Sequence, residues 1–428
     1  MGSNLRVFRL EYRDLLTVGT ISTATMTFRY DDGYLSSARA TPLSLSLPLS
    51  NRPYELSVFQ PYFEGLLPEG EARRALAGEL RLPEQDWLSL LAACGRDCIG
   101  DVVIRDEGDR DPFEEHGYNA ITHNDLIEMF LDRPSRALEN ATMRLSLAGA
   151  QDKTGLAHQP EAPMTEGWLQ PKGTAATTHI LKPSPLRDIP EIEYLCMSAA
   201  NGCGIRAANV SLLDLGQPIL AVERFDRSIS PDSADLHVTR LHQEDLAQAF
   251  GITPGSKNAE LEGGSIRSIA HFLRSQASTP ALDILHFAQM LCFSYLIGDC
   301  DAHLKNYSLM YGTGRHPRRT ALSLAPAYDL VCTTYFPRYS RDMAMSLGGS
   351  RNIDEVAPST FSALARELGI TEAALKRLAS PLAERIEVAI RAAGDGSMGP
   401  VLESTPYIAN ALIEDIAPRR EILRTFCQ

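Results

Sequence analysis

A chain of 428 residues exceeds the roughly 250–300 residues at which a single hydrophobic core stops growing, so two or three domains are expected. Hydrophobic residues make up 44% of it and charged residues 22%, a composition that excludes pervasive disorder, a collagen-like repeat and a disulfide scaffold. The net charge of −13 argues against broad nucleic-acid binding by this chain alone, because phosphates attract the opposite sign. A local basic patch is still compatible with that charge.

The first hundred residues are expected to form a small mixed domain. The predicted strands are Arg6–Leu10, Leu15–Val18, Met26–Tyr30 and the alternating segment Leu43–Leu47, and the predicted helices are Gly70–Leu80 and Glu84–Ala93. The charged and punctuated stretch 105–112 predicts a solvated linker.

The rest of the chain changes character near Arg227, from strand-rich to almost wholly helical. The predicted strands before that point are Thr178–Leu181, Val210–Leu213 and Ile219–Val222. The predicted helices are Asn124–Leu131 after the cap Thr122, Pro190–Ala200, His242–Phe250, Ala281–Gly298, Pro358–Leu368, Glu372–Ala393 and Ile408–Phe426. A β-rich lobe joined to a helical lobe predicts a two-lobed α+β protein with a cleft.

Neither the cysteines nor the apolar segments indicate a secreted or membrane protein. The eight cysteines are scattered and never form C-x-x-C, so no zinc site is indicated, and without a signal peptide they are typical of reduced thiols in a cytoplasmic protein. The most apolar stretch, Ala281–Gly298, contains Asp283, His286 and Gln289, which a bilayer core would penalise. We therefore expect a buried helix of a globular domain and no membrane association.

The strongest chemical signal is the segment GDCDAHLKN at 298–306, which follows this apolar helix. An aspartate with an asparagine five residues later is how phosphotransferases place a catalytic carboxylate beside a Mg²⁺-binding amide. Asp329, after a further strand-like run, supplies a second hard oxygen ligand of the kind that Mg²⁺ prefers. The spacing therefore predicts Asp301 as the catalytic residue and Asn306 with Asp329 as the metal ligands.

Two further segments have features of a nucleotide site. SLAGAQDK at 146–153 combines small residues, which let backbone N–H groups approach a phosphate, with a lysine; it is no Walker A loop, and a simple tight turn is the alternative. Lys182 ends an apolar strand, where kinases place a phosphate-binding lysine, and is one of only six lysines; an ordinary strand-end lysine is the alternative. Either Glu193 or Glu191 on the next helix is a candidate partner for Lys182; the alternative is that either glutamate simply lies on a solvated helix face. The strand 219–227 has an extended backbone suited to an adenine edge, and the polar cluster 242–245 is read as a capped helix start.

Nine ordered blocks resemble the HipA family of toxin kinases over essentially the whole chain. They are LSLSLPL at 43–49, FEGLLPEG at 63–70, GRDCIG at 95–100, SLAGAQDK at 146–153, THILK at 178–182, VERFDR at 222–227, QED at 243–245, GDCDAHLKN at 298–306 and the pair Tyr328-Asp329.

This resemblance implies an ATP- and Mg²⁺-dependent serine/threonine protein kinase, the toxin of a bacterial toxin–antitoxin pair, that phosphorylates a translation component such as an aminoacyl-tRNA synthetase. It implies a two-lobed protein-kinase-like α+β fold: an extra N-terminal subdomain (1–137), a β-rich N-lobe (138–226) and an all-helical C-lobe (227–428). The implied partner is a DNA-binding antitoxin of the HipB type, through which alone the chain would meet nucleic acid.

The resemblance also carries site residues over by position. Asp301 matches the catalytic aspartate, and Ser146 matches the serine whose autophosphorylation silences such kinases; its phosphate would add roughly −1.5 to −2 charges beside a site for anions. The residues expected around the nucleotide and its metal ion are Ala148, Gly149, Ala150, Gln151, Asp152, Lys153, Lys182, Glu223, Arg224, Phe225, His303, Lys305, Asn306, Tyr328 and Asp329. Two departures from the family pattern are Asp152, where a longer glutamate is usual, and Asp299, an extra acid two residues before Asp301.

Two other functions remain open at this point. Small-molecule phosphotransferases use a similar Asp-x-x-x-x-Asn loop, but they lack the blocks at 43–49 and 63–70. A kinase-shaped corepressor would mainly bind the antitoxin; the intact Asp301, Asn306, Asp329 and Lys182 argue against an inactive kinase, although the two roles can coexist.

Overall fold

The computed structural model describes residues 4–11, 14–108, 116–131, 137, 140–141, 143, 145–149, 151–184, 186–230, 236–313 and 320–428. The chain divides into two compact units, each built from separate segments. Unit 1 comprises 1–184, 215–257 and 309–321, and unit 2 comprises 185–214, 258–308 and 322–428. Both units contain helices and strands, so the predicted two-part α+β architecture is confirmed. The predicted three-domain boundaries stay a prediction.

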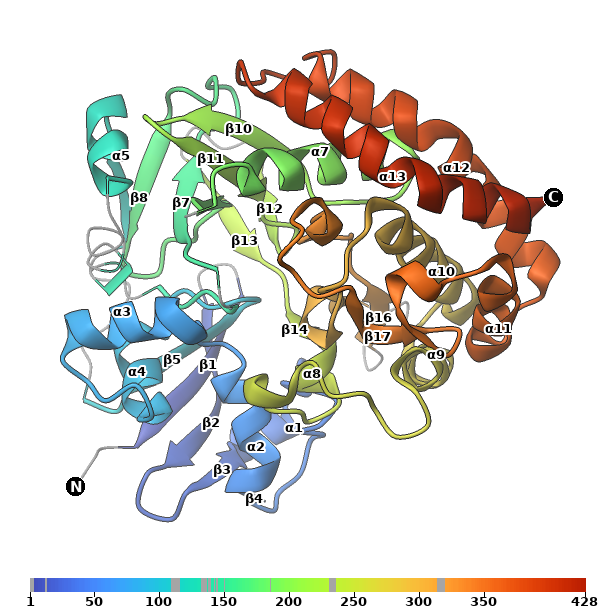
Figure 1. The fold of residues 1–428 in the computed structure, drawn as a ribbon. Helices are drawn as coiled ribbons and strands as arrows, with labels where there is room; N and C mark the ends of the chain where they lie inside the picture. The colour runs from blue at the N-terminus through green and yellow to red at the C-terminus, as the bar shows by residue number, and fades with distance from the viewer. Residues whose placement is uncertain are drawn as a thin grey trace. The chain divides into compact units, whose positions relative to one another are not determined.

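The first part of unit 1 is an antiparallel sheet of five strands in the order β4-β3-β2-β1-β5, with helices against it (Figure 1). The strands are β1 Leu5–Glu11, β2 Asp14–Ser22, β3 Thr27–Tyr30, β4 Tyr54–Glu55 and β5 Val102–Asp106, and the helices are α1 Asp32–Ser36, α2 Leu56–Glu64, α3 Gly70–Leu80 and α4 Trp87–Cys94. Phe28 from the sheet meets Phe63 of α2, and Phe59 of α2 meets Trp87 of α4, so aromatic contacts join the layers. Helix α4 begins at Trp87 because the side chain of Asp86 accepts the N–H of Ser89.

Two predictions for this part are wrong. Leu43–Leu47 forms no strand: Leu47 N–H donates to Ser44 O in a tight turn, and Leu45 N–H donates to the side chain of Glu244 instead of to a neighbouring strand. The alternation of leucine and polar residues in this segment reflects a turn that buries both Leu43 and Leu47. The expected linker 105–112 begins inside β5, where Arg105 is buried, and its residues 109–112 lie outside the described residues.

The second sheet of unit 1 has neighbouring antiparallel strands in the order β11-β9-β7-β8-β6. Their bounds are β6 Gly117–Ala120, β7 Thr154–His158, β8 Trp168–Lys172, β9 His179–Lys182 and β11 Pro218–Glu223, which confirms the strands predicted near 178–181 and 219–222. Helix α5, His123–Met129, is capped by Thr122 as predicted. Unit 1 also contains β12 Arg227–Ile229 paired with β13 Val238–Arg240, then β14 Gln243–Asp245, α8 Leu246–Ala249 and most of β15 Ser308–Thr313. The helix predicted at 242–250 is shorter because Asp245 caps α8.

Unit 2 is mainly helical. Its helices are α7 Ile189–Gly202, α9 Ser265–Gln276, α10 Pro280–Ile297, α11 Pro358–Leu368, α12 Glu372–Gly394 and α13 Thr405–Cys427, so the predicted helices in these positions are confirmed and α9 was missed. In Figure 1, α12 and α13 lie side by side with α7 against them. Helix α10 is, within the described ranges, the one helix long and apolar enough to cross a bilayer, but most of it is buried inside the protein, as predicted.

The chain after Arg227 is less helical than predicted. Besides β12 to β15 it contains β16 Thr320–Leu324 and, in unit 2, the antiparallel pair β17 Asp342–Leu347 and β18 Ser350–Asn352. Before Arg227, unit 2 also holds β10 Val210–Asp214, which confirms the strand predicted at 210–213. Strand β17 buries Met343, Met345 and Leu347 in alternation, the pattern of a strand with one covered face. The expected all-helical C-terminal part is therefore corrected to a helical part with a small β element.

Candidate active site

The loop that carries Asp301 is fixed at the end of α10. Gly298 ends the helix with φ +76°, and a Cβ there would collide with the hydroxyl of Thr334, so a glycine is required. Thr333 then holds the next turn: its Oγ1 donates to Gly298 O at 3.0 Å and accepts the N–H of Cys300 at 2.9 Å. On this rigid base the side chain of Asp301 is exposed to solvent.

Asn306 and Asp329, both predicted as metal ligands, lie in direct contact. Asn306 ends the short helix η2 (Leu304–Asn306), and its Nδ2 donates to Asp329 Oδ2 at 3.1 Å. Tyr328 ties the segment that carries Asp329 to the segment that carries Asn306, because its hydroxyl donates to Lys305 O at 2.6 Å. Asp329 has φ +58°, a conformation that is costly for a residue with a side chain and is concentrated at functional sites. An amide and a carboxylate held side by side are hard oxygen donors that fit Mg²⁺.

Asp299, the extra acid of the sequence, is buried next to this pair. Burial raises the pKa of Asp299 well above its ordinary value, and the charges of Asp301, Asp329 and Glu193 raise it further. Its Oδ1 accepts the N–H of Asp301 at 3.0 Å. The side chain of Asp299 therefore orients the backbone of Asp301, and burial opposes a further negative charge at this position.

A small pocket in unit 2 opens beside the same loop. Leu291, Met343 and Met345 line it together with Asp299 and Ala302, which lie within two residues of Asp301 in the chain. The contribution of β17 to this pocket was not predicted, although its period-two alternation was present in the sequence.

The predicted phosphate loop lies in unit 1 and is tied to the first hundred residues. Ser146 is fully buried; its N–H donates to Asp97 O at 3.1 Å and its Oγ to Leu66 O at 2.8 Å. Gly149 has φ +104°, and its carbonyl accepts the N–H of Glu69 at 2.9 Å.

The rest of this loop includes Lys153, the lysine predicted to be part of it. Lys153 Nζ donates to Ala148 O at 2.7 Å, so the lysine closes the loop on itself. Gln151 and Asp152 are half-buried between them, and Ala150 lies outside the described residues.

Lys182 and the predicted hinge also belong to unit 1. Lys182 is buried at the end of β9 opposite Leu220 of β11, and Glu223 at the end of β11 is exposed. Phe225 is half-buried, whereas the guanidinium of Arg224 is buried and bonded within the protein. A nucleotide contact of Arg224 would therefore have to use its backbone.

The two candidate partners of Lys182 lie in unit 2, on α7. Glu191 accepts the hydroxyl groups of Ser404 and Thr405 at 2.8 Å each and so anchors the start of α13. Glu193 is fully buried and acts on the pKa of Asp299. An ion pair between Glu193 and Lys182 stays a prediction.

An exposed aspartate at the end of a buried helix, next to an Asn–Asp pair, is the arrangement of phosphotransferases that bind a metal–nucleotide complex. The sequence matches the family model of the HipA-like C-terminal domain over residues 145–390 and that of the HipA N-terminal domain over residues 13–105. The chain belongs to the HipA family.

Several of its relatives are named as kinases. The chain is 31% identical over 415 residues to the protein named "Putative kinase Y4mE" of Sinorhizobium fredii, which covers 93% of each chain. It is 27% identical over 366 residues to the serine/threonine-protein kinase toxin HipA of Shewanella oneidensis, 82% of this chain and 80% of that protein. A solved structure of the Shewanella oneidensis toxin–antitoxin system, a complex of HipA, HipB and operator DNA, is similar in fold: the TM-score is 0.78 at 24% identity, covering 98% of this chain and 96% of that one.

Proposed function

We propose that this protein is a serine/threonine protein kinase that uses ATP and Mg²⁺ and acts as the toxin of a toxin–antitoxin pair. The observation that carries the proposal is the exposed carboxylate of Asp301 on a loop fixed by Thr333, beside the contacting pair Asn306 and Asp329. The kinase names of the relatives support it.

In the proposed reaction, Asp301 orients the hydroxyl of a protein serine or threonine and accepts its proton as the hydroxyl oxygen bonds to the γ-phosphorus. The bond from that phosphorus to the bridging oxygen of ADP breaks. Asn306 and Asp329 would hold Mg²⁺, which neutralises phosphate charge when bound.

The groups of unit 1 would bind the nucleotide. Lys182 and the N–H groups of the loop 148–153 would contact the phosphates, and the hinge 223–225 the adenine. In unit 2, His303, Lys305 and Tyr328 complete the proposed set. Lys305 and Tyr328 each directly precede a proposed metal ligand, and the carbonyl of Lys305 accepts the hydroxyl of Tyr328. The N–H of His303 donates to Asn306 Oδ1 at 3.1 Å.

The proposed target is a translation component such as an aminoacyl-tRNA synthetase, and the proposed partner is a DNA-binding antitoxin of the HipB type, both in the cytoplasm. The toxin name of the Shewanella relative and the HipA, HipB and DNA complex of similar fold support this assignment. The net charge of −13 is consistent with nucleic acid being met through the antitoxin.

Regulation by autophosphorylation at Ser146 is part of the proposal. In the described conformation the hydroxyl is buried and bonded to Leu66 O. Modification therefore requires the loop to swing out first, and the bulky dianion would then prevent its return.

The experiment that tests the proposal is incubation of the full chain with labelled ATP, Mg²⁺ and a bacterial lysate, followed by mass spectrometry of new phosphosites. New phosphoserine or phosphothreonine on proteins, absent with Asp301→Ala, is the expected result. Label found only on small molecules would indicate a small-molecule phosphotransferase. No transfer at all, together with binding of an antitoxin, would leave the corepressor role.

A further inference from the structure

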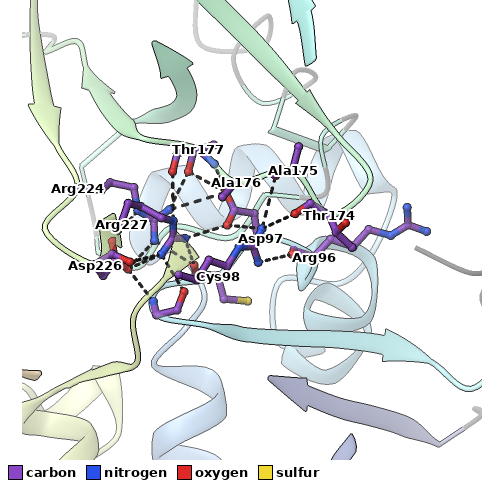
Figure 2. A network of polar contacts seen from close by, with 12 residues as sticks. Arg96, Asp97, Cys98, Thr174, Ala175, Ala176, Thr177, Arg224, Asp226 and Arg227 are labelled. Carbon is purple, nitrogen blue, oxygen red and sulfur yellow. Dashed lines mark hydrogen bonds and ion pairs between the residues drawn. The ribbon is translucent and has the colours of Figure 1, made fainter. Parts of the chain in front are cut away.

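A buried network of charged residues joins the first hundred residues of unit 1 to the proposed nucleotide site. Figure 2 shows its centre, where Asp97 is surrounded by arginine and threonine side chains. Asp97 Oδ1 accepts from Arg227 at 2.9 Å and lies 3.0 Å from the guanidinium of Arg240. Its Oδ2 accepts both the N–H and the hydroxyl of Thr177, at 3.0 and 2.7 Å. All four side chains are buried, so water cannot substitute for these contacts.

One arm of the network fixes the segment 224–227, which includes Arg224 and Phe225 of the proposed hinge. Arg224 donates to Thr177 Oγ1 at 2.8 Å and to Cys98 O at 3.0 Å, and its N–H donates to Thr178 O at 2.9 Å. At the other end of the segment, Arg227 donates to Gly100 O at 2.8 Å and to Thr177 O at 3.1 Å. The backbone of 224–227 is thus held from both ends by groups that themselves converge on Asp97.

A second arm reaches the phosphate loop. The carbonyl of Asp97 accepts the N–H of Ser146 at 3.1 Å, and Asp97 forms a parallel bridge with Leu145. Ser146 lies two residues before the proposed phosphate-binding positions. A single residue therefore holds the loop with its backbone and the hinge segment with its side chain.

The electrostatics of the cluster explain why a carboxylate is needed at this position. Three buried arginines, Arg224, Arg227 and Arg240, face two buried carboxylates, Asp97 and Asp226. Burial by itself would raise the pKa of Asp97, but the charges of the three arginines outweigh it and hold that pKa below its ordinary value. Without the charge of Asp97, three guanidinium groups would share one carboxylate in the interior, and the segment 224–227 would have to move to relieve the repulsion.

We propose that Asp97 is a positioning residue for nucleotide binding, which holds the phosphate loop and the hinge segment at a fixed separation. The inference rests on the proposed function, because it assigns the loop 148–153 and the hinge 223–225 to the nucleotide. It places the role of the block GRDCIG within unit 1, whereas Asp301, Asn306 and Asp329 belong to unit 2.

The test compares Asp97→Asn with Asp101→Asn in the full chain. Asp101 is a matched control: it is also buried, in the same segment, and its side chain accepts from Arg9 at 2.8 Å and contacts His242 at 2.7 Å. Among the described residues, its side chain has no bond to the loop or the hinge. We expect Asp97→Asn to weaken ATP binding, measured by calorimetry, about tenfold or more, the loss that about 1.4 kcal/mol produces. Turnover at saturating ATP should change by less than about threefold, because the catalytic loop is not altered. Asp101→Asn should destabilise the protein without changing ATP affinity.

A second measurement does not depend on catalysis. In Asp97→Asn, hydrogen exchange should become faster in both segments, 145–149 and 223–227. In Asp101→Asn it should be unchanged in both segments. If Asp97→Asn does not fold, Thr177→Val provides the same comparison, since it removes the hydroxyl that donates to Asp97 and accepts from Arg224. Unchanged affinity and exchange in a folded variant, or an equal loss of affinity in Asp101→Asn, would overturn the inference. If the wild type neither binds ATP nor transfers phosphate from it, the proposed function fails. The hydrogen-exchange result alone then decides whether Asp97 couples the two segments.

Discussion

The hydroxyl of Ser146 donates a hydrogen bond to the carbonyl oxygen of Leu66, with 2.8 Å between the two oxygens, and the side chain is fully buried. The contact joins the proposed phosphate loop to the block FEGLLPEG at 63–70, 80 residues away in sequence. A serine hydroxyl can donate to a carbonyl, whereas the oxygens of a phosphoserine dianion can only accept. The modified residue is therefore incompatible with this position.

The first prediction is that phosphorylation of Ser146 lowers nucleotide affinity strongly. The added roughly −1.5 to −2 charges cannot be buried against Leu66 O, so the loop leaves and its phosphate-binding groups leave with it. Calorimetry of phosphorylated and phosphatase-treated wild-type protein measures the difference. Ser146→Ala should bind nucleotide and acquire no phosphate at this position. Equal affinities of the two wild-type samples would show that Ser146 is not the switch.

The second prediction concerns Asp301 and Asp329. Asp301→Ala removes the proposed proton acceptor, and Asp329→Ala removes a proposed metal ligand, so phosphoryl transfer should fall by roughly 10²–10⁴-fold in each. The fold should be retained, since Asp301 is exposed and Asp329 is half-buried. Asp395→Ala, at an exposed position of the same unit, is the control and should keep its activity. Near-normal transfer by Asp301→Ala or Asp329→Ala would refute the assignment of that residue.

The third prediction is that Lys182→Arg impairs the use of ATP. Lys182 is 5% exposed at the end of β9, where a compact ammonium fits and a wider, planar guanidinium does not. The expected result is a rise in KM for ATP of about tenfold or more. Lys172→Arg, at the exposed end of β8 in the same sheet, should change nothing. Normal kinetics of Lys182→Arg would identify Lys182 as an ordinary strand-end lysine.

Local signals in the sequence were sufficient where a residue's structure depends on its neighbours in the chain. Helices α3 and α11 were predicted to the residue, because Gly70 and Pro358 mark their starts and apolar residues recur at helical spacing. The Asp-x-x-x-x-Asn spacing marks a segment in which Asp301 precedes η2 by three residues and Asn306 ends η2; the roles of both residues stay predictions.

The predictions failed where distant groups decide the conformation. The turn 43–47 is held by Glu244, which is about 200 residues away, and no local pattern could reveal that partner. The same holds for Asp97 and Arg227, 130 residues apart: the sequence shows GRDCIG and VERFDR as separate blocks, but only the fold shows that their charges compensate each other.

The last prediction concerns the pH dependence that Asp299 imposes on stability. Burial raises the pKa of Asp299 well above its ordinary value, and Asp301, Asp329 and Glu193 raise it further. Between the unfolded pKa, about 3.9 for an aspartate, and the raised folded pKa, the folded protein binds a proton that the unfolded chain has released. The free energy of unfolding therefore falls as the pH rises through that window.

Asp299→Asn should remove this dependence. The amide oxygen can still accept the N–H of Asp301, as Asp299 Oδ1 does at 3.0 Å, and no proton has to be bound on folding. In Mg²⁺-free buffer the variant should have a higher Tm than the wild type near neutral pH, with a difference that shrinks toward pH 4, and its transfer activity should be retained. Asp354→Asn, at an exposed aspartate of the same unit, should show no such convergence. A Tm difference that is constant across the pH range would mean that Asp299 is not protonated in the folded protein, and lost activity at full stability would mean that its charge, rather than its geometry, serves Asp301.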